Sequence, residues 1–140
     1  MPAMPDASDR TRAFARVIGP FLVIIPISVA VRASELGLVL TAFFQNAALV
    51  WITGGLLLFG GLIIIAYHDN WSNLAGIVIS LFGWLMALRG TLLLVAPQLM
   101  ARASTAAVSV TPLVVIGFVF FLLIGLWLSY VGWIAKPPAP

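Results

Sequence analysis

The 140-residue chain has no cysteine, a single histidine and few charges, because Asp, Glu, Lys and Arg together make up 8% of it. An ordinary soluble domain carries about 25% of such residues. Without cysteine, a disulfide framework, a thiolate metal site and a catalytic thiol are all excluded. Too few polar residues are present to cover a soluble globule. Intrinsic disorder is excluded as well, since disordered chains combine low hydrophobicity with high charge.

Apolar sequence is what the chain has in abundance: 63% of its residues are hydrophobic and its mean hydropathy is +1.18. A bilayer core about 30 Å thick needs a helix of about 20 apolar residues. Four stretches approach or meet that length, at 17–33, 47–67, 74–96 and 112–134. The sequence therefore predicts an all-α fold, a single transmembrane domain over residues 1–140 built as a four-helix bundle. Residues 1–12 and 136–140 are expected to be flexible tails.

The first predicted span is the least regular. Its apolar run, 17–31, is short, contains Pro20 and Pro26, and is bracketed by Arg16 and Arg32. Long basic side chains can extend to the headgroups, which makes a short span workable. A basic N-terminus followed by an apolar run is also typical of a secretory signal peptide. Because the two prolines interrupt the run, we favour a span that is retained.

The connections between spans leave two alternatives open. Residues 33–46 place apolar side chains at helical spacing on one side, namely Leu36, Val39, Leu40 and Phe43, and polar ones on another. This pattern is typical of a short interfacial helix lying in the headgroup plane, although the segment could instead continue a neighbouring span. Residues 98–110, rich in Ala, Ser and Thr, form either a loop or a second surface helix.

The basic residues predict the orientation. Arg10, Arg12, Arg16 and Lys136 would lie on one side of the membrane, and Arg32, Arg89 and Arg102 on the other. Because cytoplasmic segments gather Lys and Arg, and the first span usually dominates, we expect both termini in the cytoplasm. The N-terminal arginines account for the net charge of +3 through insertion and attraction to anionic lipid, so no nucleic-acid partner is expected.

Small residues recur at helical spacing within the spans. Span 74–96 carries Gly76, Ser80, Gly83, Ala87 and Gly90, span 47–67 carries Ala47, Gly54 and Gly61, and the last span carries Gly125, Ser129 and Gly132. In lipid, helices associate through close backbone contact at such residues. These faces either pack the helices of one subunit, or form an oligomer interface or a pore. We expect span 74–96 to be central, packed against the second and fourth spans.

Arg89 is the one charge well inside a predicted span, and intramembrane charges are candidates for function. Glu35 is the one acid expected on the same side of the membrane. A Glu35–Arg89 ion pair is therefore one hypothesis. In the other, Glu35 pairs with Arg32, three positions earlier, and Arg89 extends to the headgroups.

On the opposite side, the turn at 67–71 reads Tyr-His-Asp-Asn-Trp. His68 beside Asp69 could relay protons near neutral pH, or the turn could be a simple interfacial bend anchored by its aromatic residues. A metal site is not expected, because no second histidine or cysteine exists to complete one. Asn70 and Ser72 are expected to cap the following helix.

The residues His68-Asp69-Asn70-Trp71, Gly83-Trp84, Arg89-Gly90 and Pro97 resemble a pattern found in small, uncharacterised four-helix proteins of the bacterial inner membrane. There, a His-Asn-x-Trp-like turn opens a helix, a Gly-Trp pair follows, and a basic residue with Gly precedes a closing Pro. Asp69 departs from that pattern at the turn. The resemblance covers about a fifth of the chain. It implies four helices in a bacterial membrane and no particular activity.

An enzyme is not expected, because the spans contain no paired carboxylates, no nucleophile with a base and no cofactor motif. No cofactor is expected either. The low polar content and the small-residue faces favour a structural or accessory membrane protein that packs in the bilayer with itself or with a larger membrane complex. The alternative is a homo-oligomeric transporter or channel.

Overall fold

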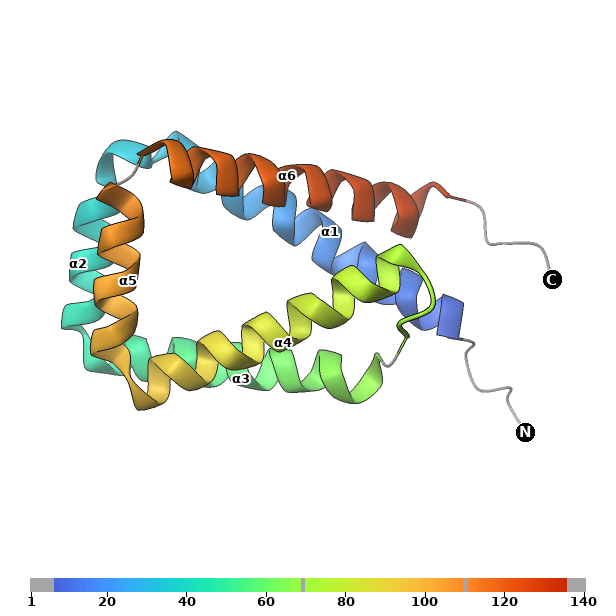
Figure 1. The fold of residues 1–140 in the computed structure, drawn as a ribbon, viewed down its shortest axis with the longest axis horizontal. Helices are drawn as coiled ribbons and strands as arrows, with labels where there is room; N and C mark the ends of the chain where they lie inside the picture. The colour runs from blue at the N-terminus through green and yellow to red at the C-terminus, as the bar shows by residue number, and fades with distance from the viewer. Residues whose placement is uncertain (1–6, 69, 110, 136–140) are drawn as a thin grey trace.

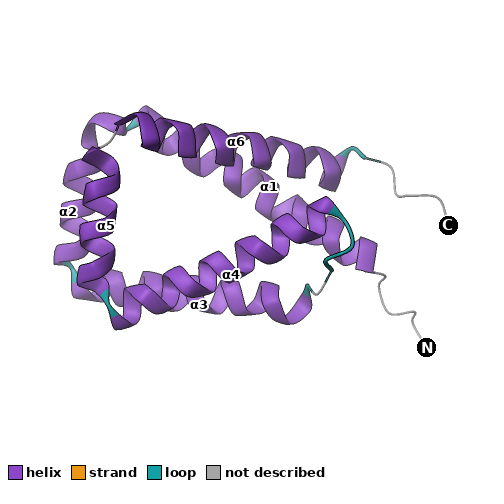
Figure 2. Cartoon of the chain, in the orientation of Figure 1, coloured by secondary structure: helices purple, strands orange, loops and turns teal. Residues whose placement is uncertain are grey.

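The computed structural model describes residues 7–68, 70–109 and 111–135, and every regular element in these ranges is helical (Figures 1 and 2). In chain order they are α1 (Ala7–Val31), the short 3-10 turn η1 (Ala33–Glu35), α2 (Leu36–Gln45), α3 (Ala47–Tyr67), α4 (Leu74–Val95), α5 (Pro97–Ser109) and α6 (Thr111–Trp133). Helices α1, α3, α4 and α6 are long and apolar enough to cross a membrane. The prediction of an all-α chain with four candidate spans is confirmed.

The long helices form two antiparallel pairs, α1 with α6 and α3 with α4. The shorter α2 and α5 lie side by side and join the two pairs at one end (Figure 1). At the other end, α1 meets the turn between α3 and α4. The chain therefore forms a triangular frame with a closed corner, where α1 begins, α6 ends and the α3–α4 turn lies, and a wide end formed by α2 and α5.

The expected central position of span 74–96 is half wrong. Helix α4 packs along α3, but α6 packs along α1. The reason is Gly19, which sequence analysis did not select. A Cβ on Gly19 would lie 2.6 Å from the backbone nitrogen of Ser129, and one on Gly125 would lie 2.9 Å from the Gly19 carbonyl oxygen. This close approach joins α1 to α6.

The small-residue faces of α3 and α4 face each other. A Cβ on Gly61 would lie 2.7 Å from the carbonyl oxygen of Gly83, and one on Gly90 would lie 2.7 Å from that of Gly54. These glycines therefore allow the two backbones to touch within one chain. Gly76 corrects the prediction, because its open side faces the backbone of Asn70 in the turn and not a neighbouring helix.

Helix α1 begins at Ala7, so residues 7–12 do not form the predicted flexible tail. Alanine and arginine are good helix formers, and Thr11 is buried, with its side chain donating to the Ala7 carbonyl at 2.9 Å. Tertiary contact thus extends the helix beyond its apolar run. Residues 1–6 and 136–140, the rest of the predicted tails, lie outside the described residues.

The prolines do not break α1, and the structure compensates for one of them directly. Pro20 has no amide hydrogen to donate to the carbonyl of Arg16, four residues earlier. Trp133 at the end of α6 donates its indole Nε1–H to that carbonyl instead, at 3.3 Å. In return, Arg16 Nε donates to the Gly132 carbonyl at 2.8 Å, placing a cation at the negative end of α6. The two ends are locked together.

The connections at the wide end are helical. Residues 36–45 form a separate short helix, α2, one of the two alternatives for that segment, and residues 97–109, for which a loop and a helix were both open, form α5. Pro97 occupies the first position of α5, where a missing amide hydrogen costs nothing. Asn46 ends α2 and caps α3, with its side chain accepting from the Leu49 amide at 3.2 Å.

Candidate functional site

Four polar side chains are buried together at the closed corner of the frame. Thr11 comes from α1, His68 and Asn70 from the turn after α3, and Ser80 from α4; none is more than 9% exposed. Among the described residues, these are the buried polar side chains. We call them the His68 cluster.

Hydrogen bonds join the His68 cluster across long sequence separations. His68 Nε2 lies 3.1 Å from Thr11 Oγ1, and His68 Nδ1 lies 3.0 Å from Ser80 Oγ. Asn70 Nδ2 donates to the same Thr11 hydroxyl at 3.1 Å. One threonine on α1 is thus bound to two residues of the α3–α4 turn, and the histidine continues the connection into α4.

The bonds of Thr11 fix the role of one ring nitrogen of His68. Thr11 donates its single hydroxyl proton to the Ala7 carbonyl, so its oxygen accepts from Asn70 and from His68 Nε2–H. Ser80 Oγ lies 3.0 Å from His68 Nδ1 and donates to the His68 backbone carbonyl at 3.5 Å.

Asn70 organises the turn as well as binding α1. Its side-chain oxygen accepts from the Ser72 amide at 3.1 Å and from the Ser72 hydroxyl at 2.5 Å. The expectation that Asn70 and Ser72 cap the next helix is wrong. Asn73 caps α4 by accepting from the Gly76 amide at 2.6 Å, because it is the residue immediately before the first helical position. Asp69, predicted beside His68, lies outside the described residues.

Aromatic and aliphatic side chains surround the His68 cluster. The edge of Phe14 meets the His68 ring at a centroid distance of 5.5 Å, and Phe21 of α1 meets Phe82 of α4 at 6.5 Å. The apolar core is adjacent and draws on both helix pairs; its buried members are Ala15, Ile18, Leu22, Ile64, Ala75, Ile79 and Leu128. The closed corner is therefore where the two pairs are held together.

The chemistry available to the His68 cluster is limited by its burial. His68 and Ser80 have the contact of a base with a hydroxyl nucleophile, yet they are only 3% and 2% exposed. Within the described ranges, no three His, Asp or Glu side chains lie close enough together to hold a metal ion. No buried side-chain nitrogen or oxygen there lacks a hydrogen-bond partner. Such a satisfied network is suited to fixing one arrangement of helices.

At the wide end, the structure brings together two of the three predicted charged residues. Arg32 Nη2 and Glu35 Oε2 form an ion pair at 2.7 Å, with side chains 68% and 52% exposed. Their spacing within one 3-10 turn places them on the same side. This is the local alternative; the Glu35–Arg89 pair does not form among the described residues, and Arg89 lies on an exposed face of α4.

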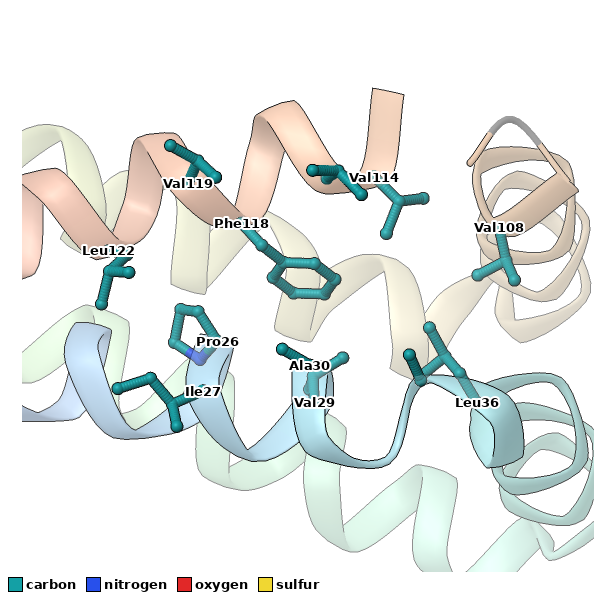
Figure 3. Close-up of a pocket in the computed structure, with 12 residues that line it drawn as sticks. Pro26, Ile27, Val29, Ala30, Leu36, Val108, Val114, Phe118, Val119 and Leu122 are labelled. Atoms are coloured by element: carbon teal, nitrogen blue, oxygen red, sulfur yellow. The ribbon is translucent and has the colours of Figure 1, made fainter. Parts of the chain in front are cut away.

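A cavity of about 380 Å³ opens where α1 and α6 approach α2 and α5 (Figure 3). Its lining side chains are all apolar and include Pro26 and Ala30 from α1 and Phe118 and Leu122 from α6. The sequence of an apolar run does not predict such a cavity, because the cavity depends on how closely two helices pack in the folded chain.

Sequence reasoning also missed Thr11, Ser80 as a polar contact, and Arg16 as a helix cap. Ser80 was noticed only as a small residue of the span, although a hydroxyl in an apolar run is a signal that a polar partner faces it. No signal in the sequence pointed to Thr11, because a threonine in a polar, charged segment is unremarkable.

Comparison with known proteins finds no matching protein-family model, no matching curated protein and no matching solved structure.

Proposed function

We propose that this chain is a structural or accessory protein of the bacterial inner membrane, which crosses the bilayer four times and associates with a larger membrane complex. The observation that carries the proposal is that the close polar and glycine contacts of this chain lie between its own helices. The His68 cluster and the glycine faces of both helix pairs all hold the frame itself together. These contacts fix the arrangement of the helices, and the outer surface of the helices is then what binds a partner protein.

That outer surface is apolar and bulky along the spans. Phe59 on α3, Trp84 on α4 and Phe120 on α6 are 65%, 57% and 59% exposed. In water such a surface would aggregate, whereas in a bilayer it faces acyl chains or another membrane protein. We expect these large apolar side chains to contact the partner membrane protein.

The small-residue faces are therefore not the surfaces through which the chain would bind another copy or another protein. The faces of Gly61, Gly83, Gly90 and Gly125 are already filled by neighbouring helices of the same chain. Two other glycines, Gly55 on α3 and Gly117 on α6, would meet nothing within 4 Å if a Cβ were added. They provide positions where bulk can be added to the outer surface without disturbing the frame.

In the proposed orientation, the closed corner is cytoplasmic. Arg10, Arg12 and Arg16 belong to the helix that begins there, and basic residues favour the cytoplasmic side. Helices α2 and α5 then lie along the outer surface of the membrane. The exposed Arg32–Glu35 pair at the start of α2 favours a position in the headgroup region.

Gentle extraction followed by mass measurement tests the proposal. An accessory protein should be recovered in a particle of fixed stoichiometry with a different membrane protein. Gly55→Trp or Gly117→Trp should weaken that association, while Gly37→Trp, at an equally open position on the short helix α2, should not. A defined assembly of this chain alone that passes solute in liposomes would instead establish the transporter or channel alternative. A lone monomer would contradict both.

A further inference from the structure

The apolar cavity results from the geometry of the α1–α6 pair. The helices touch through Gly19, Ser129 and Gly125, and nearer the wide end the two helices line the cavity together, with Pro26 on α1 and Phe118 on α6. The space left between them, about 380 Å³, has the size of a ligand pocket. All of its lining side chains are apolar, as Figure 3 illustrates with Pro26 and Phe118 facing each other.

Such a cavity is unfavourable for water and is accessible from the outside of the protein. A buried water needs two to four polar partners, and the lining offers no polar side chain. The cavity is open on one side, since Ile27, Val115 and Val119 in its lining are 48%, 54% and 48% exposed. The inference rests on the proposed membrane location, where the surrounding solvent is hydrocarbon, and a flexible acyl chain is then the available occupant.

Charged residues next to the lining residues in the sequence indicate which lipid would supply that chain. Ala33 and Leu36 line the cavity, and their sequence neighbours Arg32 and Glu35 form the exposed ion pair. This pair presents one cation and one anion side by side. An aminophospholipid headgroup carries the complementary charges, because its phosphate can accept from the guanidinium while its ammonium donates to the carboxylate. A purely anionic headgroup would be repelled by Glu35.

We infer that this corner of the frame binds one zwitterionic aminophospholipid, with an acyl chain in the cavity between α1 and α6 and the headgroup over Arg32 and Glu35. The lipid fills the space between helices that the protein's own side chains leave open. It also fixes the depth of the wide end in the membrane.

Native mass spectrometry of the purified full chain in mild detergent tests the site. After a delipidating wash, we expect one phosphatidylethanolamine to rebind at least several-fold more tightly than phosphatidylglycerol. Ala30→Phe, which fills the cavity, should abolish binding, whereas Ala48→Phe, which adds the same bulk to an exposed position of α3, should not. Arg32→Gln combined with Glu35→Gln should bring the two lipids to equal affinity, and Arg102→Gln on α5 should leave the preference intact.

A photoactivatable phosphatidylethanolamine with a diazirine in its acyl chain gives a second readout on the unaltered protein. We expect it to label the α6 segment that contains Phe118 in preference to α3 or α4. Equal binding of both lipids, unchanged binding by Ala30→Phe, or labelling spread over all spans would overturn the site. Those results would leave the four membrane crossings standing, since crossings are measured separately by labelling from each side.

Discussion

Thr11 and His68 show how a few polar atoms hold two helix pairs in one arrangement. Their hydrogen bond joins residues that are far apart in the chain, and Asn70 adds a second bond to the same hydroxyl. In a low-dielectric environment these bonds matter mainly because breaking them strands buried donors. The His68 cluster is therefore expected to contribute much of the free energy that holds the two helix pairs together at the closed corner.

Thr11→Val tests this with little change in shape. The substitution removes the hydroxyl that accepts from His68 Nε2 and from Asn70 Nδ2, and we expect the loss of these two buried hydrogen bonds to cost about 1–3 kcal/mol of stability. Thr41→Val is the matched control, because Thr41 makes the same bond to the carbonyl four residues earlier, at 2.9 Å, but is exposed and has no tertiary partner among the described residues. It should change stability by less than about 0.5 kcal/mol. Equal effects in detergent unfolding experiments would show that the cluster contributes nothing.

Part of this site could be predicted from the sequence. His68 and Asn70 were candidates because they are polar residues at the end of an apolar run. Their partners were not, since Thr11 and Ser80 reach them only through tertiary packing of α1 and α4 on the turn. Of the two hypotheses for Glu35, the structure shows the local one, because three-residue spacing favours the Arg32–Glu35 pair over a pair with a separate helix.

At the scale of helices, the positions of glycine decide which helices pair. Gly61 and Gly55 both lie on α3, but Gly61 is packed against another helix and Gly55 is not. A Cβ on Gly61 would collide with the backbone of α4, whereas a Cβ on Gly55 would meet nothing within 4 Å.

Gly61→Ala should therefore destabilise the chain by about 1–3 kcal/mol through overpacking. Gly55→Ala should be neutral or stabilising by up to about 1 kcal/mol, because alanine favours helix over glycine. Unfolding of both variants under the same conditions measures the difference. A Gly61→Ala protein as stable as Gly55→Ala would mean that α3 and α4 do not touch along this face.

The bond from Trp133 to α1 gives a second prediction for the helices. If the indole replaces the donor that Pro20 lacks, Trp133→Phe should destabilise the wild-type chain by about 1 kcal/mol. In a Pro20→Ala background the same change should cost less, because the Arg16 carbonyl regains an intrahelical donor. A double-mutant cycle measures this coupling. Additive effects would show that the Trp133–Arg16 bond does not compensate for the proline.

Over the whole molecule, apolar run length predicted the four spans well, but not their arrangement. Run length reports how much chain is needed to cross hydrocarbon, which is a local property. The pairing of α6 with α1 depends on Gly19 and on α5, a helix whose mixed composition left its structure open. The triangular frame follows from these two features, and the length of an apolar run reports neither of them.

The triangular frame predicts which segments lie on the same side of the membrane. If α1, α3, α4 and α6 all cross the bilayer, the start of α1, the α3–α4 turn and the end of α6 share one surface. Helices α2 and α5 share the other. Because the chain contains no cysteine, single cysteines can report on each surface without further changes.

Cysteines at Ser8, Ser72 and Ala135 for one surface, and at Ser34 and Thr105 for the other, should be tested with a membrane-impermeant maleimide in sealed vesicles of known orientation. The first three should be labelled only from the cytoplasmic side and the last two only from the opposite side. Labelling of Ser8 and Ala135 from different sides, or of Ser72 together with Ser34, would contradict the four-crossing frame.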